Sequence, residues 1–265
     1  MRCPRGHSFD IAREGYVNLL IPRDRERGID GDSAAMLAAR RRFLDRGAFR
    51  PLLDAVAVRV HDTIEQRRAR GDASPALIVE AGCGEGYYIG SIADRIESAV
   101  CVGFDVSKAA VRLAARRYAS ATFAVANTRR RLYVDSSAAA VLLNIFAPRN
   151  IREFARVLQP DGSLVVVLPD RDHFAGLRDR FGLLDVREGK EADLLEEARG
   201  LFVPAERAAV RFTVAMDDAA VLDFIAMGPN ARHAPRGITH ATAMTDEASV
   251  VVLTLRRSGV RATRD

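Results

Sequence analysis

Short apolar runs alternate with amphipathic segments along the chain from residue 76 onward. The apolar runs predict buried strands, and the segments between them place their apolar residues at helical spacing. A repeated strand–helix alternation is typical of a doubly wound α/β fold. We expect strands near residues 77–81, 99–105, 121–126, 138–145 and 163–168, and helices near residues 87–97, 107–118, 149–158 and 172–180.

Two further apolar runs lie near the end of the chain, at residues 208–214 and 250–255. They flank residues 217–227, which predict another helix. As a hairpin-like final pair, the two runs would complete a sheet of seven strands. Residues 182–206 are charged and helix-prone, and no chemistry can be read from them.

Residues 1–70 follow a different pattern. Residues 3–20 predict a turn and two short strands, and Ser33 or Asp32 can cap a helix that ends at Gly47. Pro51 then opens a second amphipathic helix that ends near residue 70. The chain therefore divides into a small β element at residues 1–32, a helical linker at residues 33–72 and an α/β domain at residues 73–265.

Three glycines separate the first strand of the α/β domain from its helix, namely Gly82, Gly84 and Gly86. Glycine permits positive φ and lets a ligand approach the backbone, and the N–H groups of a following helix favour anions. The dinucleotide-binding pattern G-x-G-x-x-G fails at Tyr87. The pattern acid-x-G-x-G-x-G, which starts at Glu80, fits the first motif of S-adenosylmethionine-dependent methyltransferases.

A second acidic residue supports this interpretation. Asp105 ends the next predicted strand, where its carboxylate can accept hydrogen bonds from the ribose hydroxyls of the cofactor. The alternative is a tight turn with an unrelated surface aspartate.

The composition fits one globular domain of ordinary size with an appendage. The chain has 265 residues, of which 48% are hydrophobic, and it contains neither an apolar run of membrane-span length nor a signal peptide. Its three cysteines lie in different contexts and do not form a disulfide framework. We therefore expect a cytoplasmic protein with no membrane partner.

Basic residues outnumber acidic ones by 40 to 35, which gives a net charge of +5 and a pI near 9.5. Nearly all of the basic residues are arginines, whose guanidinium groups suit phosphates, so the charge slightly favours a nucleic-acid partner. An arginine-preferring genome is the alternative explanation. The run of Arg40, Arg41 and Arg42 on the first predicted helix can contact RNA phosphates, or it can be a solvated helix face.

Candidate substrate residues lie in the loops after the predicted strands, because an open α/β sheet binds its ligands at the carboxyl ends of its strands. At the end of strand 138–145, Asn144 could bond a base edge and Phe146 could stack on the base, although a core position for Phe146 is also consistent with the pattern. After strand 163–168, His173 could reach the amino-acid end of the cofactor, or it could be an exposed histidine without a role.

Short segments in one order along nearly the whole chain carry a family resemblance. They are Cys3–Asp10, Glu14–Leu20, Gly31–Ser33 with Met36, Ala39–Arg41, Phe43–Gly47, Pro51–Leu52, Gly82–Tyr88, Asp105–Lys108 and Ala147–Pro148. Together they resemble the guanine-N1 methyltransferases of 23S ribosomal RNA, a family that includes the tylosin-resistance enzymes of macrolide producers. The resemblance implies a Rossmann-like class I methyltransferase fold with S-adenosylmethionine as cofactor.

The resemblance also implies a reaction and a set of contacts. The reaction is methyl transfer to N1 of a guanine in a hairpin loop of 23S ribosomal RNA, near the peptide tunnel where macrolides bind, and it suggests a role in antibiotic resistance. Whether the enzyme forms a homodimer stays open. The implied cofactor contacts come from the glycine turn with Gly84 and Glu85, from Asp105 with Val106 beside it, and from Phe49 and His173.

The sequence leaves the proton transfer open. Loss of the proton from N1 could need a carboxylate such as Asp170, or only a cation such as Arg149 that also contacts the RNA and stabilises charge on O6. Two other functions also stay open, namely a methyltransferase of small molecules and a non-catalytic RNA-binding protein with a decayed cofactor site. The arginine run argues against the first, and the intact glycines and Asp105 argue against the second.

The N-terminal segment departs from the family in one respect. The family has a zinc ribbon with a C-x-x-C pair ahead of its second half, and only Cys3 and His7 of that ligand set are found here. A structural zinc ion requires four tetrahedral ligands. Cys83 lies in the cofactor turn and Cys101 in a strand, so neither completes the site. We expect no stably bound zinc, with a start codon assigned too late as the alternative.

Overall fold

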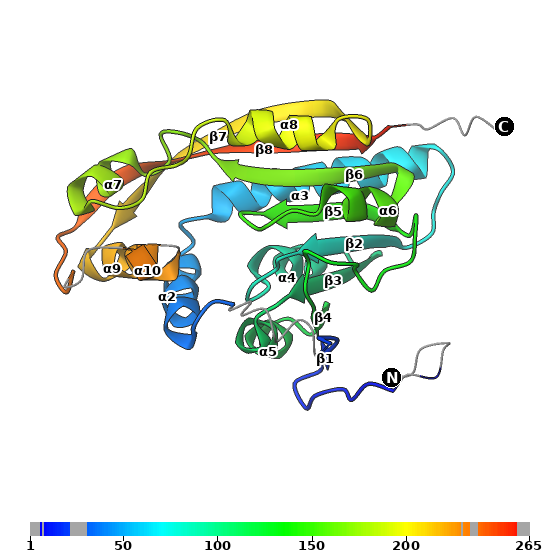
Figure 1. Cartoon of the computed structure of the whole chain (residues 1–265), viewed down its shortest axis with the longest axis horizontal. Coiled ribbons are helices and arrows are strands. Elements are labelled where there is room, and N and C mark those ends of the chain that lie inside the picture. The colour runs from blue at the N-terminus through cyan, green and yellow to red at the C-terminus, as the bar shows by residue number, and fades with distance from the viewer. Residues whose placement is uncertain (1–5, 7, 22–30, 229, 234–237, 259–265) are drawn as a thin grey trace.

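The computed structural model describes residues 6, 8–21, 31–228, 230–233 and 238–258. Its strands are β1 (Val17–Asn18), β2 (Ala76–Ala81), β3 (Ala99–Asp105), β4 (Thr122–Val125), β5 (Ala139–Ile145), β6 (Leu158–Pro169), β7 (Phe202–Met216) and β8 (Met244–Arg257). They form one sheet in the order β1-β4-β3-β2-β5-β6-β8-β7 (Figure 1). Strands β1 to β6 run parallel, and β8 is antiparallel to both of its neighbours, β6 and β7.

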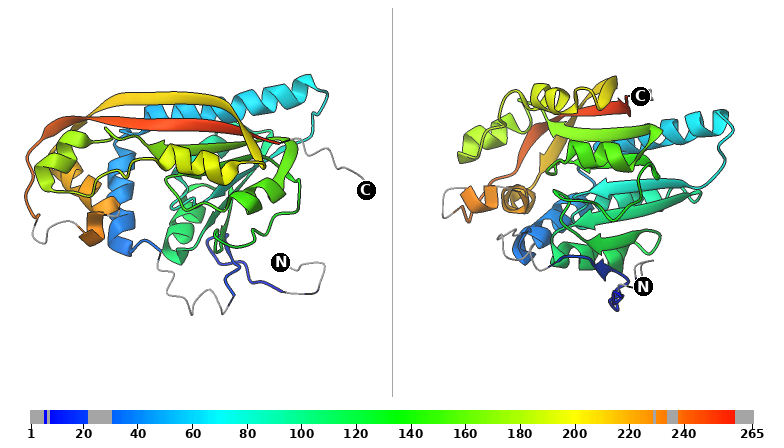
Figure 2. Two further views of the ribbon diagram at one scale, coloured as in Figure 1. Left: turned by 45° about the horizontal axis from the view of Figure 1, so that its top comes forward. Right: turned by 45° about the vertical axis from the view of Figure 1, so that its right-hand side comes forward.

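Helices cover both faces of this sheet (Figures 1 and 2). They are α2 (Ala34–Asp45), α3 (Arg50–Ala69), α4 (Tyr87–Ala93), α5 (Lys108–Arg117), α6 (Ile151–Val157), α7 (Ala175–Phe181), α8 (Lys190–Ala198), α9 (Asp218–Met227) and α10 (Asn230–His233). One core lies under α3, α4 and α5 and the other under α6 and α8. Successive residues of β2 point to opposite cores, because Ile78 lies in one with Ile89, and Val79 lies in the other with Phe154.

The predicted α/β pattern is confirmed, since each expected strand and helix from residue 77 onward is found near its expected place. Two strands begin earlier than expected. Strand β6 begins at Leu158, because residues 159–162 leave the ladder between Leu158 and Ser163 and hide the strand pattern. Strand β7 begins at Phe202, because it is an edge strand whose first half is exposed and therefore polar.

The sheet has eight strands in the described part of the chain, rather than the seven expected, because the N-terminal segment adds one. Val17 in β1 pairs with Ala124 in β4, and Ile11 forms an antiparallel bridge with Val17. The short β pairing expected in this segment is therefore present, and it extends one edge of the main sheet. The division of the chain at residues 32 and 72 stays a prediction.

The hairpin of β7 and β8 extends past the parallel strands on the side where those strands end, and α2 and α9 lie there (Figure 2). Phe43 of α2 packs on Phe224 of α9, with ring centroids 5.5 Å apart. Of the two caps that the sequence offered, Ser33 and Asp32, Ser33 caps α2, because its Oγ accepts the N–H of Met36 at 3.2 Å. Among the described residues, no helix is both long and apolar enough to cross a membrane.

Candidate active site

The glycine turn after β2 is tightly packed on one side and open on the other. Gly82, Gly84 and Gly86 have φ values of 85°, 53° and 81°, which residues with side chains rarely adopt. A β-carbon on Gly82 would lie 2.4 Å from Cβ of Ala147, so no side chain fits there. At Gly84 the nearest neighbour would be Nη1 of Arg40 at 3.4 Å. The turn can therefore present its backbone to a ligand at Gly84.

Asp105, at the end of β3, holds this turn through two hydrogen bonds, and its carboxylate can accept further hydrogen bonds from a ligand. Its Oδ2 accepts the N–H of Gly84 and its Oδ1 accepts the N–H of Ser107, both at 2.8 Å. Each carboxylate oxygen has a further lone pair, so Asp105 can also accept ribose hydroxyls. Burial raises the pKa of Asp105, and the two N–H bonds oppose that rise. Val106, which is half-buried, follows it at the same edge of the sheet.

Glu80, the acidic residue that begins the glycine motif, is buried and joins two elements of the fold. It is 1% exposed, and its Oε2 accepts the N–H of Ile89 at 3.0 Å, which ties β2 to the first turns of α4. Burial raises the pKa of Glu80 to about 8, so the side chain is largely protonated near neutral pH.

Glu85 and Arg41 form a pair beside the turn that retains unused polar atoms. Arg41 Nε lies 3.9 Å from Glu85 Oε2, and Glu85 is 4% exposed. Glu85 Oε2 and both Nε and Nη2 of Arg41 are buried with no hydrogen-bond partner in the described chain. Burial raises the pKa of Glu85, and Arg41 opposes that rise. Buried polar atoms without partners are rare, so this pair indicates a place that a polar ligand completes.

The arginine run of α2, for which the sequence left an RNA contact or a solvated helix face open, makes contacts within the protein. Each guanidinium has a partner in the protein: Arg40 binds Asp32 at 2.6 Å and the carbonyl of Met227 at 2.7 Å, Arg41 faces Glu85, and Arg42 binds Asp223 at 3.0 Å. Two of the three therefore lie at the glycine turn, and Arg42 joins α2 to α9. Sequence periodicity could not show these contacts. Apart from Asp32, the partners Glu85, Met227 and Asp223 lie 44, 187 and 181 positions along the chain from the arginines that they contact.

The loops after β2 and β5 meet where the strand order reverses, which is the position of ligand sites in this class of sheet. Asn144 is 1% exposed, and its Nδ2 donates to the carbonyls of Ala81 at 3.0 Å and Pro148 at 3.1 Å. The expected base contact would need this amide at the surface, whereas the structure uses its nitrogen to join the two loops. The ring of Phe146, two residues later, is 43% exposed.

Phe146 belongs to an aromatic wall built from several elements. Phe49 is buried, with its ring centroid 6.5 Å from Phe146, 6.3 Å from His173 and 6.2 Å from Phe174. Phe146 and Phe174 have φ values of 52° and 50°. Such a conformation costs on the order of 1–3 kcal/mol at a non-glycine residue and is concentrated at functional sites. Phe146 is thus the ring of this wall that can stack on a substrate, and Phe49 supports it.

His173 and Asp170 follow β6, and Ser249 of β8 anchors both. His173 Nδ1 accepts the N–H of Ser249 at 3.2 Å, and burial lowers the pKa of His173 to about 4. The ring is therefore neutral near pH 7, with its proton assigned to Nε2 by this hydrogen bond. Asp170 Oδ2 accepts from Ser249 Oγ at 3.1 Å, and the N–H of Arg171 lowers the pKa of Asp170. Asp170 is consequently a weak base at neutral pH.

Two cations lie on the α8 side of the site. Arg149 has its Nε 3.7 Å from Oε2 of Glu197. Lys190 lies at the start of α8, and burial and the nearby charges of Arg187 and Arg149 lower its pKa. The charge of Lys190 in turn helps to lower the pKa of His173. Lys190 was not a candidate from the sequence, because it lies in a charged segment and only the tertiary fold brings it near His173.

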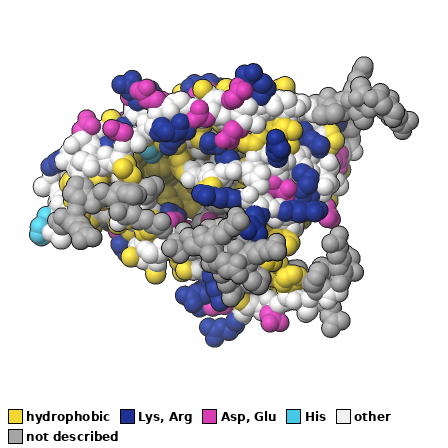
Figure 3. Space-filling model, viewed as in Figure 1, with side chains coloured by type: hydrophobic (Ala, Val, Ile, Leu, Met, Phe, Trp, Pro, Cys, Tyr) yellow, Lys and Arg dark blue, Asp and Glu magenta, His cyan; other side chains and the backbone are white. Residues whose placement is uncertain are grey.

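The surface beside the ends of the parallel strands is hollowed (Figure 3). Hydrophobic side chains form the visible floor of the hollow, and Lys and Arg side chains lie at its margin. An apolar floor with a cationic margin suits a flat base carried on a phosphate backbone.

Comparisons with known proteins agree with this geometry. A family model described as "Methyltransferase domain" matches residues 78–162, and a zinc-ribbon model described as "RlmA, N-terminal" matches residues 1–25. A Streptomyces fradiae protein named 23S rRNA (guanine(748)-N(1))-methyltransferase is 40% identical over 88% of this chain and 80% of its own length. A Micromonospora griseorubida protein named as a 23S rRNA (guanine-N(1)-)-methyltransferase is 41% identical over 98% of this chain and 90% of its own. The chain belongs to this 23S rRNA (guanine-N1)-methyltransferase family.

The family membership confirms the predicted enzyme class, the class I fold and S-adenosylmethionine as cofactor. The solved structure of geranyl diphosphate C-methyltransferase from Streptomyces coelicolor A3(2) is similar at 16% identity and a TM-score of 0.46, over 77% of this chain and 76% of that one. The residues at the glycine turn fit the cofactor. The turn is open at Gly84, and Asp105 can accept hydrogen bonds from ribose hydroxyls. Glu85 and Arg41 have polar atoms without partners that can bind the charged amino-acid group of the cofactor.

The zinc ligands considered from the sequence, Cys3 and His7, lie outside the described residues. Within the described part of the methyltransferase, no group of three or more His, Cys, Asp or Glu side chains could hold a metal ion. Cys83 and Cys101 are buried free thiols, and burial raises the pKa of both. The absence of stably bound zinc stays a prediction.

Proposed function

We propose that this methyltransferase transfers the methyl group of S-adenosylmethionine to N1 of a guanine in a hairpin loop of 23S ribosomal RNA. The observation that carries the proposal is the contact between the glycine turn and the loop that holds the exposed aromatic ring. Gly82 packs against Ala147, and Ala147 follows Phe146. A cofactor in the turn and a base on Phe146 would therefore be neighbours, and holding two reactants together is a large part of catalysis.

The chemistry of guanine explains why the substrate is a loop. N1 lies on the Watson–Crick edge, so a paired guanine hides it, and a protein reaches it only in an unpaired or flipped base. Such a base is usually held by stacking on an aromatic ring and by hydrogen bonds to its edge. Phe146 supplies the ring. The ring centroid of His173 lies 6.0 Å from that of Phe146, and its Nε2–H can donate a hydrogen bond to the edge of the base.

The site favours stabilisation of the negative charge that develops on O6 of the guanine over removal of the N1 proton by a strong general base. The lowered pKa of Asp170 makes that carboxylate a poor proton acceptor. We assign the stabilisation of negative charge on O6 to neutral His173 or to the fixed charge of Arg149, and the N1 proton passes to water. S-adenosylmethionine supplies an electrophilic methyl group on its sulfonium centre.

The remaining site residues position the cofactor. We assign the ribose hydroxyls to Asp105 and the ammonium group to Oε2 of Glu85. Arg40 holds its Nη2 in bonds to Asp32 and the carbonyl of Met227, which leaves its Nη1 beside Gly84 for the cofactor carboxylate. In this assignment Arg40, which the sequence offered as an RNA contact, serves the cofactor instead.

A methyl-transfer assay tests the proposal. Radiolabelled S-adenosylmethionine is incubated with the enzyme and protein-free 23S RNA, intact large subunits, 16S RNA or a small-metabolite extract. We expect label on 23S RNA or on the large subunit, and no label on 16S RNA. Label on small metabolites alone would support the small-molecule methyltransferase instead, and RNA binding without label would support a non-catalytic protein.

Finer features of the function also belong to the proposal. The Streptomyces fradiae relative is named for guanine 748, so that position is the first to examine. A cytoplasmic location follows from a ribosomal substrate. The role in macrolide resistance is tested by the drug sensitivity of a deletion strain, and the homodimer is tested by light scattering of the purified enzyme.

A further inference from the structure

A second run of three arginines lies in the connection between β4 and β5. Parallel strands are usually joined through a helix, but residues 126–138 contain none. The loop instead carries Arg129, Arg130 and Arg131, which begin four positions after the last residue of β4. The run has no role in the site described above.

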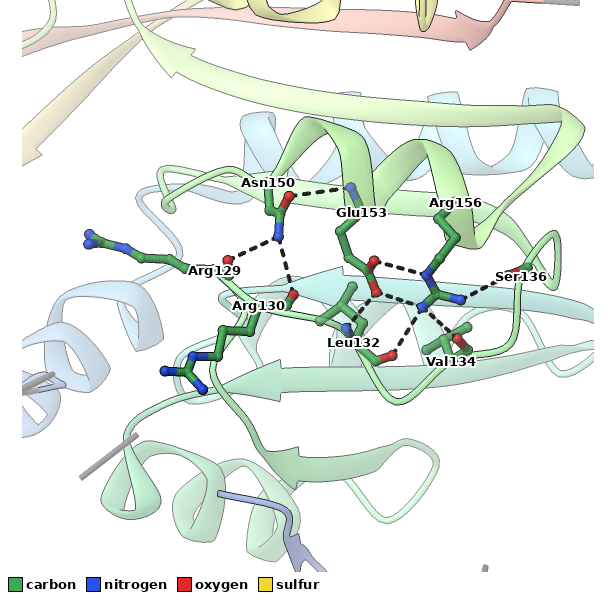
Figure 4. Close-up of polar contacts among 8 residues, drawn as sticks. All are labelled: Arg129, Arg130, Leu132, Val134, Ser136, Asn150, Glu153 and Arg156. Carbon is green, nitrogen blue, oxygen red and sulfur yellow. Dashed lines mark hydrogen bonds and ion pairs between the residues drawn. The ribbon is translucent and has the colours of Figure 1, made fainter. Parts of the chain in front are cut away.

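The protein fixes the backbone of these arginines from one side. Nδ2 of Asn150 donates to the carbonyl of Arg129 at 3.0 Å and to that of Arg130 at 3.2 Å (Figure 4). The N–H of Arg129 donates to Oδ1 of Asn127 at 3.0 Å. Asn150 is itself held in place, because its Oδ1 caps α6 by accepting the N–H of Glu153 at 3.3 Å.

The following part of the loop is held as firmly. Oε1 of Glu153 accepts the N–H of Leu132 at 2.6 Å, and Leu132 is 1% exposed. Nη2 of Arg156 donates to the carbonyls of Leu132 at 3.1 Å and Val134 at 2.8 Å. The loop is therefore braced on both sides of the arginine run, although it has no regular secondary structure (Figure 4).

The guanidinium groups of Arg129 and Arg131, in contrast, have no part in these contacts. Arg129 and Arg131 are exposed, and neither forms an ion pair with any residue that the structure describes. The side chains of Arg129 and Arg130 point away from the pair of Glu153 and Arg156 (Figure 4). In α2 each of three arginines has a protein partner, whereas here the protein binds backbone carbonyls of the run and leaves the cations of Arg129 and Arg131 exposed. Cations on an ordered backbone bind phosphates with little loss of backbone entropy.

The loop lies at the edge of the sheet where the substrate is expected. The N–H of Ala126 donates to the carbonyl of Asp105 at 2.9 Å, so the loop starts beside the ribose-binding aspartate. Asn150 then ties the arginines to the segment that follows Phe146. Phosphates held at this loop would flank a base that stacks on Phe146.

We propose that Arg129 and Arg131 form a phosphate-binding site for the backbone of the RNA substrate next to the target base. Asn150 is the positioning residue of this site. The identity of the RNA rests on the proposed function, and the site itself rests on the braced loop and its exposed cations.

The test is the salt dependence of RNA binding. The slope of log K against log salt concentration reports phosphate contacts, at about 0.7–0.9 per contact. We expect Arg129→Ala and Arg131→Ala each to reduce the slope for a 23S hairpin by about 0.7–0.9, and the double variant to reduce it by about twice as much. Arg112→Ala is the matched control, since Arg112 is exposed on α5 and α5 covers the opposite face of the sheet. The control should leave the slope unchanged, and all variants should keep the affinity for S-adenosylhomocysteine.

A second variant separates positioning from charge. Asn150→Ser keeps a helix-capping oxygen but removes the donor to both carbonyls. We expect an affinity for RNA at least threefold lower with an unchanged slope, whereas an unchanged affinity would contradict the positioning role. If the double arginine variant keeps the slope of the wild type while the wild type methylates RNA, the site is refuted and the proposed function stands. If the wild type neither binds nor methylates RNA, both fail together.

Discussion

Replacing Asp105 with alanine tests the cofactor site at one side chain. The carboxylate holds the N–H groups of Gly84 and Ser107, each at 2.8 Å, and its remaining lone pairs are assigned to two ribose hydroxyls. Alanine removes all four acceptor positions at once. The variant therefore loses the direct ribose contacts and also the bonds that shape the turn.

The expected loss can be bounded from these contacts. A hydrogen bond to a charged acceptor contributes about 1.5–3 kcal/mol, and we take about 1–2 kcal/mol for each ribose contact because burial raises the pKa of Asp105 and makes its charge more costly. Two contacts then correspond to about 2–4 kcal/mol, or a dissociation constant higher by roughly 30- to 700-fold. Loosening of the turn would add to this value.

Titration calorimetry with S-adenosylhomocysteine measures the effect without need of RNA. Ser107→Ala is the matched control, because Ser107 Oγ caps α5 by accepting the N–H of Ala110 at 3.3 Å and makes no contact assigned to the cofactor. We expect that control to bind within about threefold of the wild type. Thermal unfolding of both variants shows whether they are folded. A folded Asp105→Ala protein with the affinity of the wild type would refute the assignment of the site.

Four further predictions follow from individual residues. Arg40→Ala should weaken S-adenosylhomocysteine about tenfold but leave 5′-methylthioadenosine, which has no carboxylate, unaffected in calorimetry, and equal losses for both ligands would contradict the carboxylate contact. The pKa of Glu80 is raised to about 8 in the folded state from 4.5, so the stability of the wild type should fall as pH rises through this range. In denaturant unfolding without cofactor, Glu80→Gln should therefore be more stable than the wild type by a few kcal/mol at pH 9 and equal to it near pH 4. Parallel pH profiles of the two proteins would exclude this linkage. Phe146→Ala should lower kcat/KM for RNA by roughly 5- to 150-fold and leave cofactor affinity intact, while Phe146→Tyr keeps the ring; full activity of the alanine variant would remove Phe146 from the base site. Elemental analysis should find much less than one zinc ion per chain, and a stoichiometric ion that is lost in Cys3→Ala would overturn that expectation.

The features that the sequence predicts well are those that depend on local pattern. The glycine spacing predicts the turn, and the structure shows that it needs glycine, because Gly82, Gly84 and Gly86 have positive φ. Residue type alone also placed the cap of α2 at Ser33 or Asp32, and the structure shows that it is Ser33. Strands β2 and β5 and the second half of β6 follow from apolar runs that are buried on both faces of the parallel part of the sheet.

The features that the sequence did not predict depend on contacts between distant segments. Asn144 was expected at a base edge, but its amide nitrogen binds Ala81, which is 63 positions away. The burial of Nε and Nη2 of Arg41 beside Glu85 likewise depends on how α2 packs on the glycine turn. The run that starts at Arg129 gave a signal in the sequence, three consecutive arginines after a strand, but only the bracing by Asn150 distinguishes it from an ordinary solvated loop.

The proposed reaction places the methyl group on N1 of one guanine, and mass spectrometry of the modified RNA shows which atom carries it. The 23S RNA of a deletion strain is treated with the enzyme and S-adenosylmethionine, digested to nucleosides and compared with untreated RNA, while primer extension locates the modified position. We expect one new 1-methylguanosine in a hairpin loop. A methyl group on guanine N7, on adenine or on cytosine would contradict it.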